Sequence, residues 1–187
     1  MRILILGGNG MIGHKMYQVL SKSYEDTWVL FKKKADQVAF NEIFNKDKIV
    51  DNFDLIHFYK LETILDKLSP DVIINAAGIT IRRGINDNCY KSILINSALP
   101  HFLDNWTKLN NKRLIHFSTD CVFSGKIGFY TESSLTDAED TYGRTKALGE
   151  VISQNSITLR GSMIGRELEN KTELLEWFLN QNESTVK

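Results

Sequence analysis

The sequence opens with MRILILGGNGMIG at positions 1–13, where an apolar run leads directly into closely spaced glycines. Gly7, Gly10 and Gly13 stand between this strand-like run and a stretch with helical spacing. We expect Gly7 to permit a tight turn, Gly10 to admit a pyrophosphate to the backbone and Gly13 to let the helix pack on the sheet. The helix N-terminus would add free N–H groups and a positive dipole end. The pattern predicts dinucleotide binding; a purely structural turn is the other interpretation.

The rest of the chain alternates between two kinds of segment. Short apolar runs with many β-branched residues are separated by longer stretches with helical spacing, which predicts a parallel sheet covered on both faces. Crossovers between parallel strands are nearly always right-handed, so we expect a doubly wound α/β sheet of the Rossmann type in one domain spanning 1–187. A last helix is expected at 171–181. The predicted strands are Ile3–Leu6, Thr27–Phe31, Val72–Asn75, Leu114–Ser118 and Ile157–Leu159.

Composition excludes several classes of protein. The chain has 187 residues, with 23 Lys and Arg against 23 Asp and Glu, so the basic surplus typical of nucleic-acid binding is missing. Two cysteines do not make a disulfide scaffold and suit a reducing compartment. No apolar run approaches the length needed to cross a membrane. We therefore expect a cytoplasmic globular protein with no nucleic-acid partner, no membrane partner and no metal site.

The end of the second predicted strand bears on the choice of cofactor. An acidic residue there would bind a ribose 2′-hydroxyl, whereas a basic residue would favour a 2′-phosphate. The sequence reads Phe31-Lys32-Lys33-Lys34, and no acid follows until Asp36. We therefore favour NADP(H), with Lys32 as a binding residue, and keep NAD(H) as the alternative. A solvated lysine run is the other interpretation of this stretch.

Tyr142 and Lys146 are four residues apart and would share one face of a helix. An apolar stripe of Leu148, Val151 and Ile152 is predicted on roughly the opposite face, so the pair should face a cleft or solvent. A neighbouring ammonium favours the phenolate and would lower the pKa of the Tyr142 phenol. The phenol could then exchange a proton with a carbonyl or hydroxyl group. An incidental surface pair is the alternative.

Two predicted strands end in residues suited to a ligand site, because ligands bind at the carboxyl ends of parallel strands. Ser118 and Thr119 could hold a reacting oxygen, although hydroxyl residues are also common in turns. The run Asn75–Gly78 leaves room for a ribose or nicotinamide, or simply allows tight packing. His116 is expected to point into the packing of the sheet rather than to act as a base.

Together these segments resemble the extended short-chain dehydrogenase/reductase superfamily, and within it the dTDP-4-dehydrorhamnose reductase branch of sugar-nucleotide reductases. The likeness covers about the whole chain, and the hydroxyl-rich segment followed by Tyr-Gly-Arg-Thr-Lys is its most specific part. The resemblance implies reduction of a nucleotide-linked 4-keto-6-deoxysugar for surface polysaccharide synthesis. The segments that carry it are GGNGMIG at 7–13, NAAG at 75–78, FSTDCVFSG at 117–125 and YGRTKALGE at 142–150.

The resemblance also implies roles for individual residues. Tyr142 would donate a proton to the keto oxygen, Lys146 would tune the phenol and bind the nicotinamide ribose, and Thr119 would hold the keto oxygen with Ser118 as a second hydroxyl. The residues implied to contact the cofactor are Gly7, Gly10, Met11 and Ile12 at the pyrophosphate, Asp54 and Leu55 beside adenine, and Ala76, Ala77 and Gly78 beside a ribose. Arg82 and Arg83 could meet a substrate diphosphate or be solvated loop charges.

Two departures from the family pattern matter. Many relatives have tyrosine where this chain has Cys121, which is expected to be a packed cysteine or an exposed thiol. Relatives also continue for roughly another hundred residues that form a substrate-binding lobe, so we expect that lobe to be largely absent, leaving apolar surface that could drive homo-oligomerisation. A nucleotide-sugar epimerase or dehydratase, and a non-catalytic cofactor-binding module, remain as alternative functions.

Overall fold

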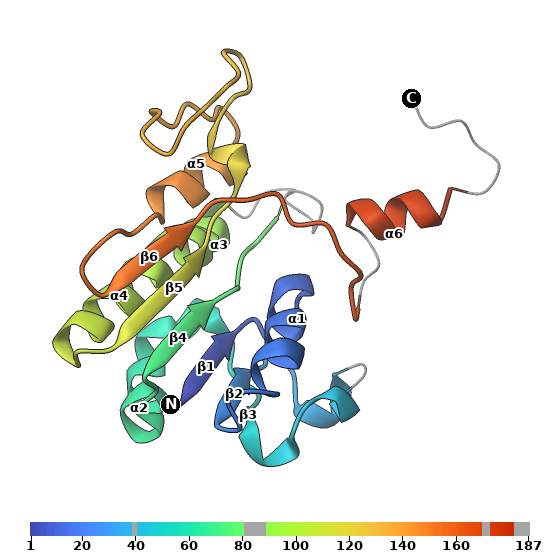
Figure 1. Ribbon diagram of the computed structural model, residues 1–187, viewed down its shortest axis with the longest axis vertical. Helices are drawn as coiled ribbons and strands as arrows, with labels where there is room; N and C mark the ends of the chain where they lie inside the picture. Colours follow the sequence, from blue (N-terminus) through green and yellow to red (C-terminus); the bar gives the residue numbers. More distant parts are fainter. Residues whose placement is uncertain (39–40, 81–88, 170–172, 182–187) are drawn as a thin grey trace.

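Six parallel strands form one sheet in the part of the chain that the computed structural model describes, residues 1–38, 41–80, 89–169 and 173–181. Their order is β3-β2-β1-β4-β5-β6 (Figure 1), so the direction of winding reverses between β1 and β4. In open α/β sheets, ligands bind outside the carboxyl ends of the strands at such a reversal. The strands are β1 (Ile3–Leu6), β2 (Thr27–Leu30), β3 (Ile49–Val50), β4 (Val72–Asn75), β5 (Arg113–Phe117) and β6 (Ser156–Leu159).

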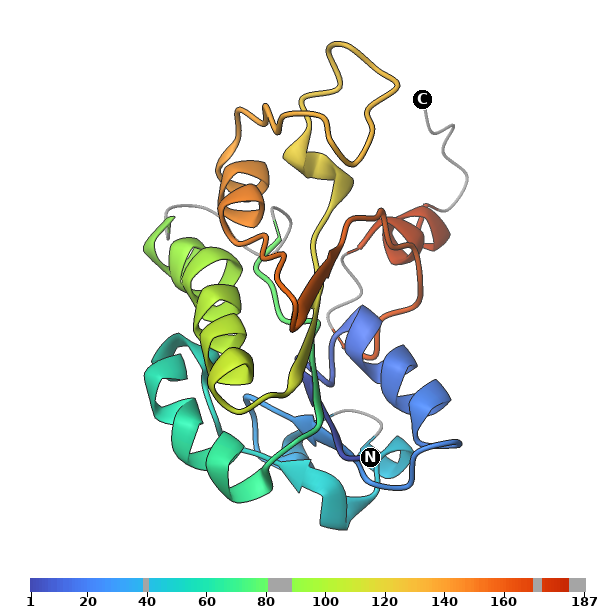
Figure 2. The ribbon, with the colours of Figure 1, turned by 60° about the vertical axis from the view of Figure 1, so that its left-hand side comes forward.

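Helices cover both faces of the sheet. Figure 2 shows α1 and α6 on one side, with α2, α4 and α5 on the other. The α-helices are α1 (Met11–Leu20), α2 (Leu61–Leu68), α3 (Cys89–Ser92), α4 (Leu99–Leu109), α5 (Thr141–Leu148) and α6 (Leu174–Leu179). The π-helical segment η5 (Ile93–Ala98) joins α3 to α4, and short 3₁₀ segments are η1 (Ala35–Gln37), η2 (Asn41–Ile43), η3 (Lys46–Lys48), η4 (Leu55–Lys60) and η6 (Asp120–Val122). Across these described ranges, no helix has both the length and the apolar character needed to span a membrane.

The core consists of two layers, one on each face of the sheet. Along β1, Ile3 and Ile5 pack into the layer beneath α1, while Leu4 and Leu6 pack into the layer beneath α2 and α4. All four side chains are at most 2% exposed. A strand buried on both faces has no polar positions to alternate with, which is why these strands are continuous apolar runs.

The predicted doubly wound sheet is confirmed, with strand ends shifted by a residue at most where strands were expected. The two-residue strand β3 was not predicted, because it is too short for a period-2 pattern to be visible. The expected helix at 171–181 is shorter as α6, and positions 171 and 172 lie outside the described residues.

Candidate active site

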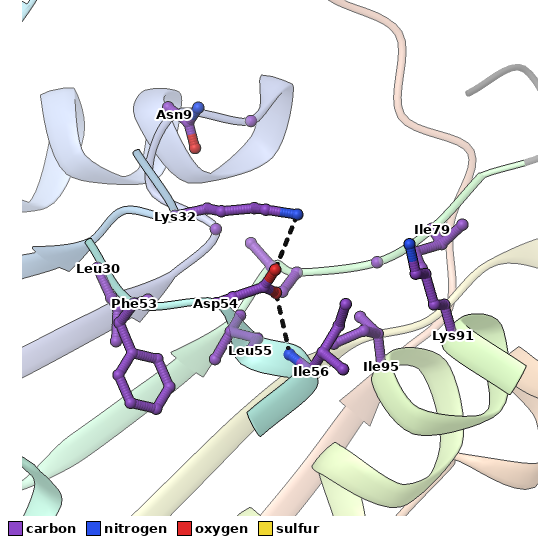
Figure 3. Close-up of a pocket in the computed structure, with 15 residues that line it drawn as sticks. Asn9, Leu30, Lys32, Phe53, Asp54, Leu55, Ile56, Ile79, Lys91 and Ile95 are labelled. Carbon is purple, nitrogen blue, oxygen red and sulfur yellow. Dashed lines mark hydrogen bonds and ion pairs between the residues drawn. The ribbon is translucent and has the colours of Figure 1, made fainter. Parts of the chain in front are cut away.

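A pocket of about 230 Å³ lies at the carboxyl ends of β1, β2 and β4 (Figure 3), next to the reversal in strand order. Eight of the predicted cofactor residues line it: Gly7, Gly10, Lys32, Asp54, Leu55, Ala76, Ala77 and Gly78. The sequence had not indicated the remaining lining residues as contacts: Asn9, Leu30, Phe53, Ile56, Ile79, Lys91 and Ile95. Five of these seven are apolar and come from four separate segments of the chain, so only the fold brings them together.

The glycine loop forms one wall of this pocket. Gly7 has φ +74°, and a Cβ there would lie 3.0 Å from backbone atoms of Ala77, so the turn requires glycine. A Cβ on Gly13 would lie 2.1 Å from the carbonyl oxygen of Gly7, which explains the close packing of α1 on the loop. Gly13, Met11 and Ile12 do not line the pocket. Their predicted contact with a cofactor therefore stays a prediction.

A lysine and an aspartate face each other across the β2 side of the pocket. The Lys32 ammonium lies 2.9 Å from the Asp54 carboxylate, and that carboxylate also caps η4 by accepting a hydrogen bond from the Ile56 N–H at 3.1 Å. Partial burial acts to raise the pKa of Asp54, but the bonds from Lys32 and Ile56 outweigh it, and the pKa is lowered. The predicted lysine is thus held at the pocket by a carboxylate.

The predicted catalytic residues lie at the carboxyl end of β5, beside the start of α5. Asp140 caps α5 by accepting from the Gly143 N–H at 2.9 Å, and a Cβ on Gly143 would lie 2.2 Å from the Cys121 carbonyl oxygen. This close approach sets the first turn of α5 against η6. As a result the Tyr142 phenol comes within hydrogen-bonding range of the Thr119 side chain.

The electrostatics of Tyr142 differ from the expectation. Burial raises the pKa of the Tyr142 phenol, the bond with Thr119 opposes this, and nearby acidic groups add to the rise. The prediction that Lys146 lowers the pKa of the Tyr142 phenol is wrong for this structure. The Lys146 ammonium instead donates to the Phe117 carbonyl oxygen at 2.6 Å. The phenol is therefore protonated at neutral pH.

Lys146 is buried, with 4% of its surface exposed. Burial lowers its pKa to about 8, partly opposed by Glu150. The prediction of an apolar stripe opposite the Tyr–Lys pair is wrong: α5 ends at Leu148, and Leu148 and Ile152 are exposed while Val151 is buried. The helix instead packs through small and polar side chains on η5, so hydrophobic periodicity did not indicate its buried face.

The two strand-end hydroxyls have different partners. Thr119 donates to Asp120 at 3.2 Å and accepts from the Cys121 N–H at 3.2 Å, so its side chain caps η6. Ser118 donates to the Glu150 carboxylate at 2.8 Å, and Arg160 holds the same carboxylate at 2.8 and 2.7 Å. The expectation that Ser118 holds substrate is therefore not supported, because its hydroxyl points into this ion pair.

Asn96, which the sequence did not indicate, joins the two halves of the site. It is fully buried in the π-helical segment η5, bonds the N–H and carbonyl of Ile79, and donates to the Thr145 hydroxyl at 3.1 Å. A Cβ on Gly149 would lie 1.8 Å from the Asn96 carbonyl oxygen, so η5 and the end of α5 are in close contact. Widened helical turns of this kind are frequent near functional sites.

His116 is fully buried beneath the site, as expected. Its Nδ1 pairs with the Asn75 amide at 3.1 Å, and burial followed by the charge of Lys146 lowers its pKa to about 3. Cys121, for which packing or exposure was left open, is exposed. Arg82 and Arg83 lie outside the described residues. Among those that are described, no group of three or more His, Cys, Asp or Glu side chains could hold a metal ion.

Comparison with known proteins shows one consistent similarity. Residues 1–167 match the family model described as RmlD substrate binding domain. A dTDP-4-dehydrorhamnose reductase from Aggregatibacter actinomycetemcomitans is 30% identical over 174 residues, covering 90% of this chain and 53% of that protein. The chain thus spans about half the length of this curated relative.

Solved structures show the same similarity in three dimensions. The crystal structure of a hypothetical dTDP-4-dehydrorhamnose reductase from Sulfolobus tokodaii aligns with a TM-score of 0.70 at 30% identity, covering 86% of this chain and 55% of that one. The Bordetella bronchiseptica enzyme WbmG, solved with NAD and UDP, aligns with a TM-score of 0.73 at 19% identity, covering 86% and 52%. The latter identity supports a shared fold alone.

Proposed function

The chain belongs to the RmlD substrate binding domain family, and we propose on that basis that it is an NAD(P)H-dependent reductase of a nucleotide-linked 4-keto-6-deoxysugar. One observation carries the proposal. The Tyr142 phenol has a raised pKa and lies close enough to the Thr119 side chain to interact with it at the end of β5, and the same sheet carries the glycine-walled pocket over β1 and β4. A proton donor near a dinucleotide site is what carbonyl reduction requires.

The described residues fit a nicotinamide dinucleotide. Gly7 and Gly10 line the pocket where side chains would narrow it, and α1 begins at Met11 with no acidic residue in its first turn. Its N–H groups and dipole are therefore open to a diphosphate. When bound, a reduced nicotinamide supplies the hydride for reduction of a carbonyl.

The chain's own residues would supply orientation and the proton. Thr119 would bond the keto oxygen through its hydroxyl, and Tyr142 would donate its phenolic proton to that oxygen. The raised pKa of Tyr142 keeps this proton in place until negative charge develops on the oxygen. Lys146, whose ammonium is held against the Phe117 carbonyl at the end of β5, would bind the nicotinamide ribose.

For the cofactor, we favour NADP(H) over NAD(H). Lys32 is the cation at the end of β2, where a 2′-phosphate would lie, although Asp54 competes for it. Lys32→Met should weaken NADPH binding and leave NADH binding nearly unchanged. Equal loss for both cofactors would argue against this role for Lys32.

The proposed function is tested with a panel of nucleotide 4-keto-sugars and either NADPH or NADH, following the absorbance of the reduced cofactor. We expect net consumption of reduced cofactor by the wild type. Tyr142→Phe should lose roughly 100-fold or more in turnover while keeping cofactor affinity, because only the proton donor is removed. Equal turnover by this variant would exclude Tyr142 as the acid.

The same assay separates the alternatives. A nucleotide-sugar epimerase would convert substrate without net consumption of reduced cofactor, because it recycles the cofactor within the site. Cofactor binding without any turnover across the panel would favour a non-catalytic module. The proximity of Thr119 and Tyr142 favours an enzyme, because binding a dinucleotide does not require a proton donor there.

We also propose that residues 1–187 act as one dinucleotide-binding domain and associate with further copies. Large apolar side chains are exposed at the end of α5 and on the edge strand β6, namely Leu148, Ile152, Ile157 and Leu159. Exposed apolar groups of this kind favour association. Sedimentation equilibrium should show a dimer or larger species, and a monomer across the concentration range would contradict the proposal.

A further inference from the structure

A carboxylate lies where the carboxyl ends of β5 and β6 meet the end of α5. Glu150 accepts a hydrogen bond from the Ser118 hydroxyl at 2.8 Å, and its two oxygens accept from the Arg160 guanidinium at 2.8 and 2.7 Å. The side chains of Glu150 and Arg160 are only 11% and 24% exposed. A carboxylate buried to this degree is costly unless its bonds are kept, so the arrangement fixes the position of the charge.

Arg160 is held in place from its other side. Its Cζ lies 5.0 Å from the centroid of the Phe123 ring, and its Nη1 donates to the Glu132 carbonyl oxygen at 3.2 Å. The Phe123 ring stacks in turn on Tyr130, with centroids 4.4 Å apart. A cation over an aromatic face is attracted to it, so these contacts orient the guanidinium towards Glu150.

The same strand end holds the Lys146 ammonium. Lys146 donates to the Phe117 carbonyl oxygen, and the next residue, Ser118, donates to Glu150. Two adjacent residues at the end of β5 therefore hold an ammonium and a carboxylate. Burial lowers the pKa of Lys146 to about 8, and the negative charge of Glu150 opposes that change.

Other titratable groups lie on the elements around Lys146, but Glu150 is the charged group that acts on its pKa. Replacing Glu150 leaves all of these groups in place, so a change in the titration of Lys146 would report on Glu150. The groups are His116 on β5, Tyr142 on α5, Asp120 on η6, Cys89 and Lys91 on α3, and His101 on α4.

We propose that Glu150 is a positioning residue for Lys146: its carboxylate, paired with Arg160, supports the charged form of the ammonium that binds the nicotinamide ribose. The inference rests on the proposed function, in which Lys146 binds that ribose. Glu150 is itself bound by Ser118 and Arg160, so it acts on the cofactor through Lys146. Because the pair is charge-matched, loss of the acid and loss of the base should affect Lys146 in opposite directions.

The test measures NADPH affinity by fluorescence titration between pH 7 and 10, above the range where a phosphate monoester titrates, about pH 6. Wild-type affinity should fall as Lys146 loses its proton, with a midpoint of about 8. Glu150→Gln should lower this midpoint by about 0.5–1 pH unit and weaken NADPH binding about twofold to fivefold at pH 8. Arg160→Met leaves the carboxylate without its cation and should raise the midpoint by a similar amount. E150D keeps the charge and should restore most of the wild-type midpoint.

Asp104→Asn is the matched control. The Asp104 carboxylate accepts from the hydroxyls of Ser153 and Ser156 and from the Lys108 ammonium, and its side chain is also 11% exposed. It lies beside the start of β6, whereas Glu150 lies at the end of that strand. D104N should therefore lower the free energy of unfolding, as E150Q does, while leaving the midpoint for NADPH binding unchanged. Urea unfolding checks that each variant is folded under the assay conditions.

A merely structural role for the pair predicts a different result. E150Q and R160M would then weaken NADPH binding by the same factor at every pH, with the wild-type midpoint. That result, or midpoints that shift in the same direction, would overturn the inference. A wild-type affinity that stays constant from pH 7 to 10 would also overturn it, because Lys146 would then not bind the cofactor through its charge.

Failure of the proposed function itself would look different, since the wild type would then not bind NADPH at all. The titration of Lys146 can still be followed through stability, from the pH dependence of the difference in urea midpoint between each variant and the same variant carrying Lys146→Met. Opposite shifts in E150Q and R160M would uphold the action of Glu150 on Lys146. Identical pH dependence in both backgrounds would overturn it.

Discussion

Replacing Lys146 by methionine should make the folded chain more stable at neutral pH while removing its activity. The Lys146 residue is 4% exposed, and burial lowers its pKa from 10.5 to about 8. At 1.36 kcal/mol per pH unit, that difference is a penalty of about 3 kcal/mol for keeping the charged form buried. K146M also leaves the Phe117 carbonyl oxygen without this donor, which costs about 2 kcal/mol, so the variant should gain about 1 kcal/mol at pH 7.

The pH dependence gives a sharper test than the single value. Because the pKa of Lys146 in the folded chain lies below its unfolded value, the unfolded chain binds more protons between about pH 8 and 10.5. The contribution of Lys146 should therefore make the wild type's free energy of unfolding rise with pH across that window. Below pH 8 the full penalty for burying the charged ammonium is present. The difference in free energy of unfolding between K146M and the wild type should therefore shrink by up to about 3 kcal/mol across the window and change sign.

Urea unfolding followed by tryptophan fluorescence at pH 7, 8, 9 and 10 would measure this difference. K67M serves as the control, because Lys67 is exposed and its replacement should leave the pH dependence of the wild type unchanged. Parallel curves for wild type and K146M would refute the reasoning, since they would mean that Lys146 is not a desolvated ammonium. Lost activity together with gained stability would mark a residue kept for function.

Two further substitutions test contacts around the site. Gly143→Ala should lower the free energy of unfolding by about 1–3 kcal/mol, because a Cβ there would lie 2.2 Å from the Cys121 carbonyl oxygen, and an unchanged urea midpoint would show that η6 can move away. Arg160→Met should cost about 2–3 kcal/mol, because it leaves the Glu150 carboxylate, 11% exposed, without its cation. The double variant E150Q/R160M should recover most of that loss, and additive losses in a double-mutant cycle would contradict a direct pair.

Much of the fold could be predicted from the sequence because its determinants are local. The apolar runs buried on both faces, such as Ile3–Leu6, need no tertiary information to be recognised as strands of a parallel sheet. The glycine loop is equally readable, because Gly7 and Gly13 are required by backbone geometry within a few residues of each other. The short strand β3 had no such pattern and was missed.

The sequence predicted which kinds of residue form the site, but only part of their arrangement in space. Tyr142, Lys146 and Thr119 were indicated by spacing and by position at a strand end, and the structure brings Tyr142 and Thr119 together. The direction of the Tyr142 pKa was wrong, because the spacing of two residues on a helix does not reveal how deeply each is buried. Ser118 was assigned to substrate because its partner Glu150 lies 32 positions away in the sequence.

By itself, the sequence determined the order of strands and helices, the glycine turn and the kinds of side chain available for chemistry, since these depend on neighbours along the chain. Tertiary structure alone decided that Lys146 is buried against Phe117 and that Lys91 lines the pocket opposite Lys32. The physical reason is that burial, and with it the free energy of a charge, is set by groups far apart in sequence that only packing brings into contact.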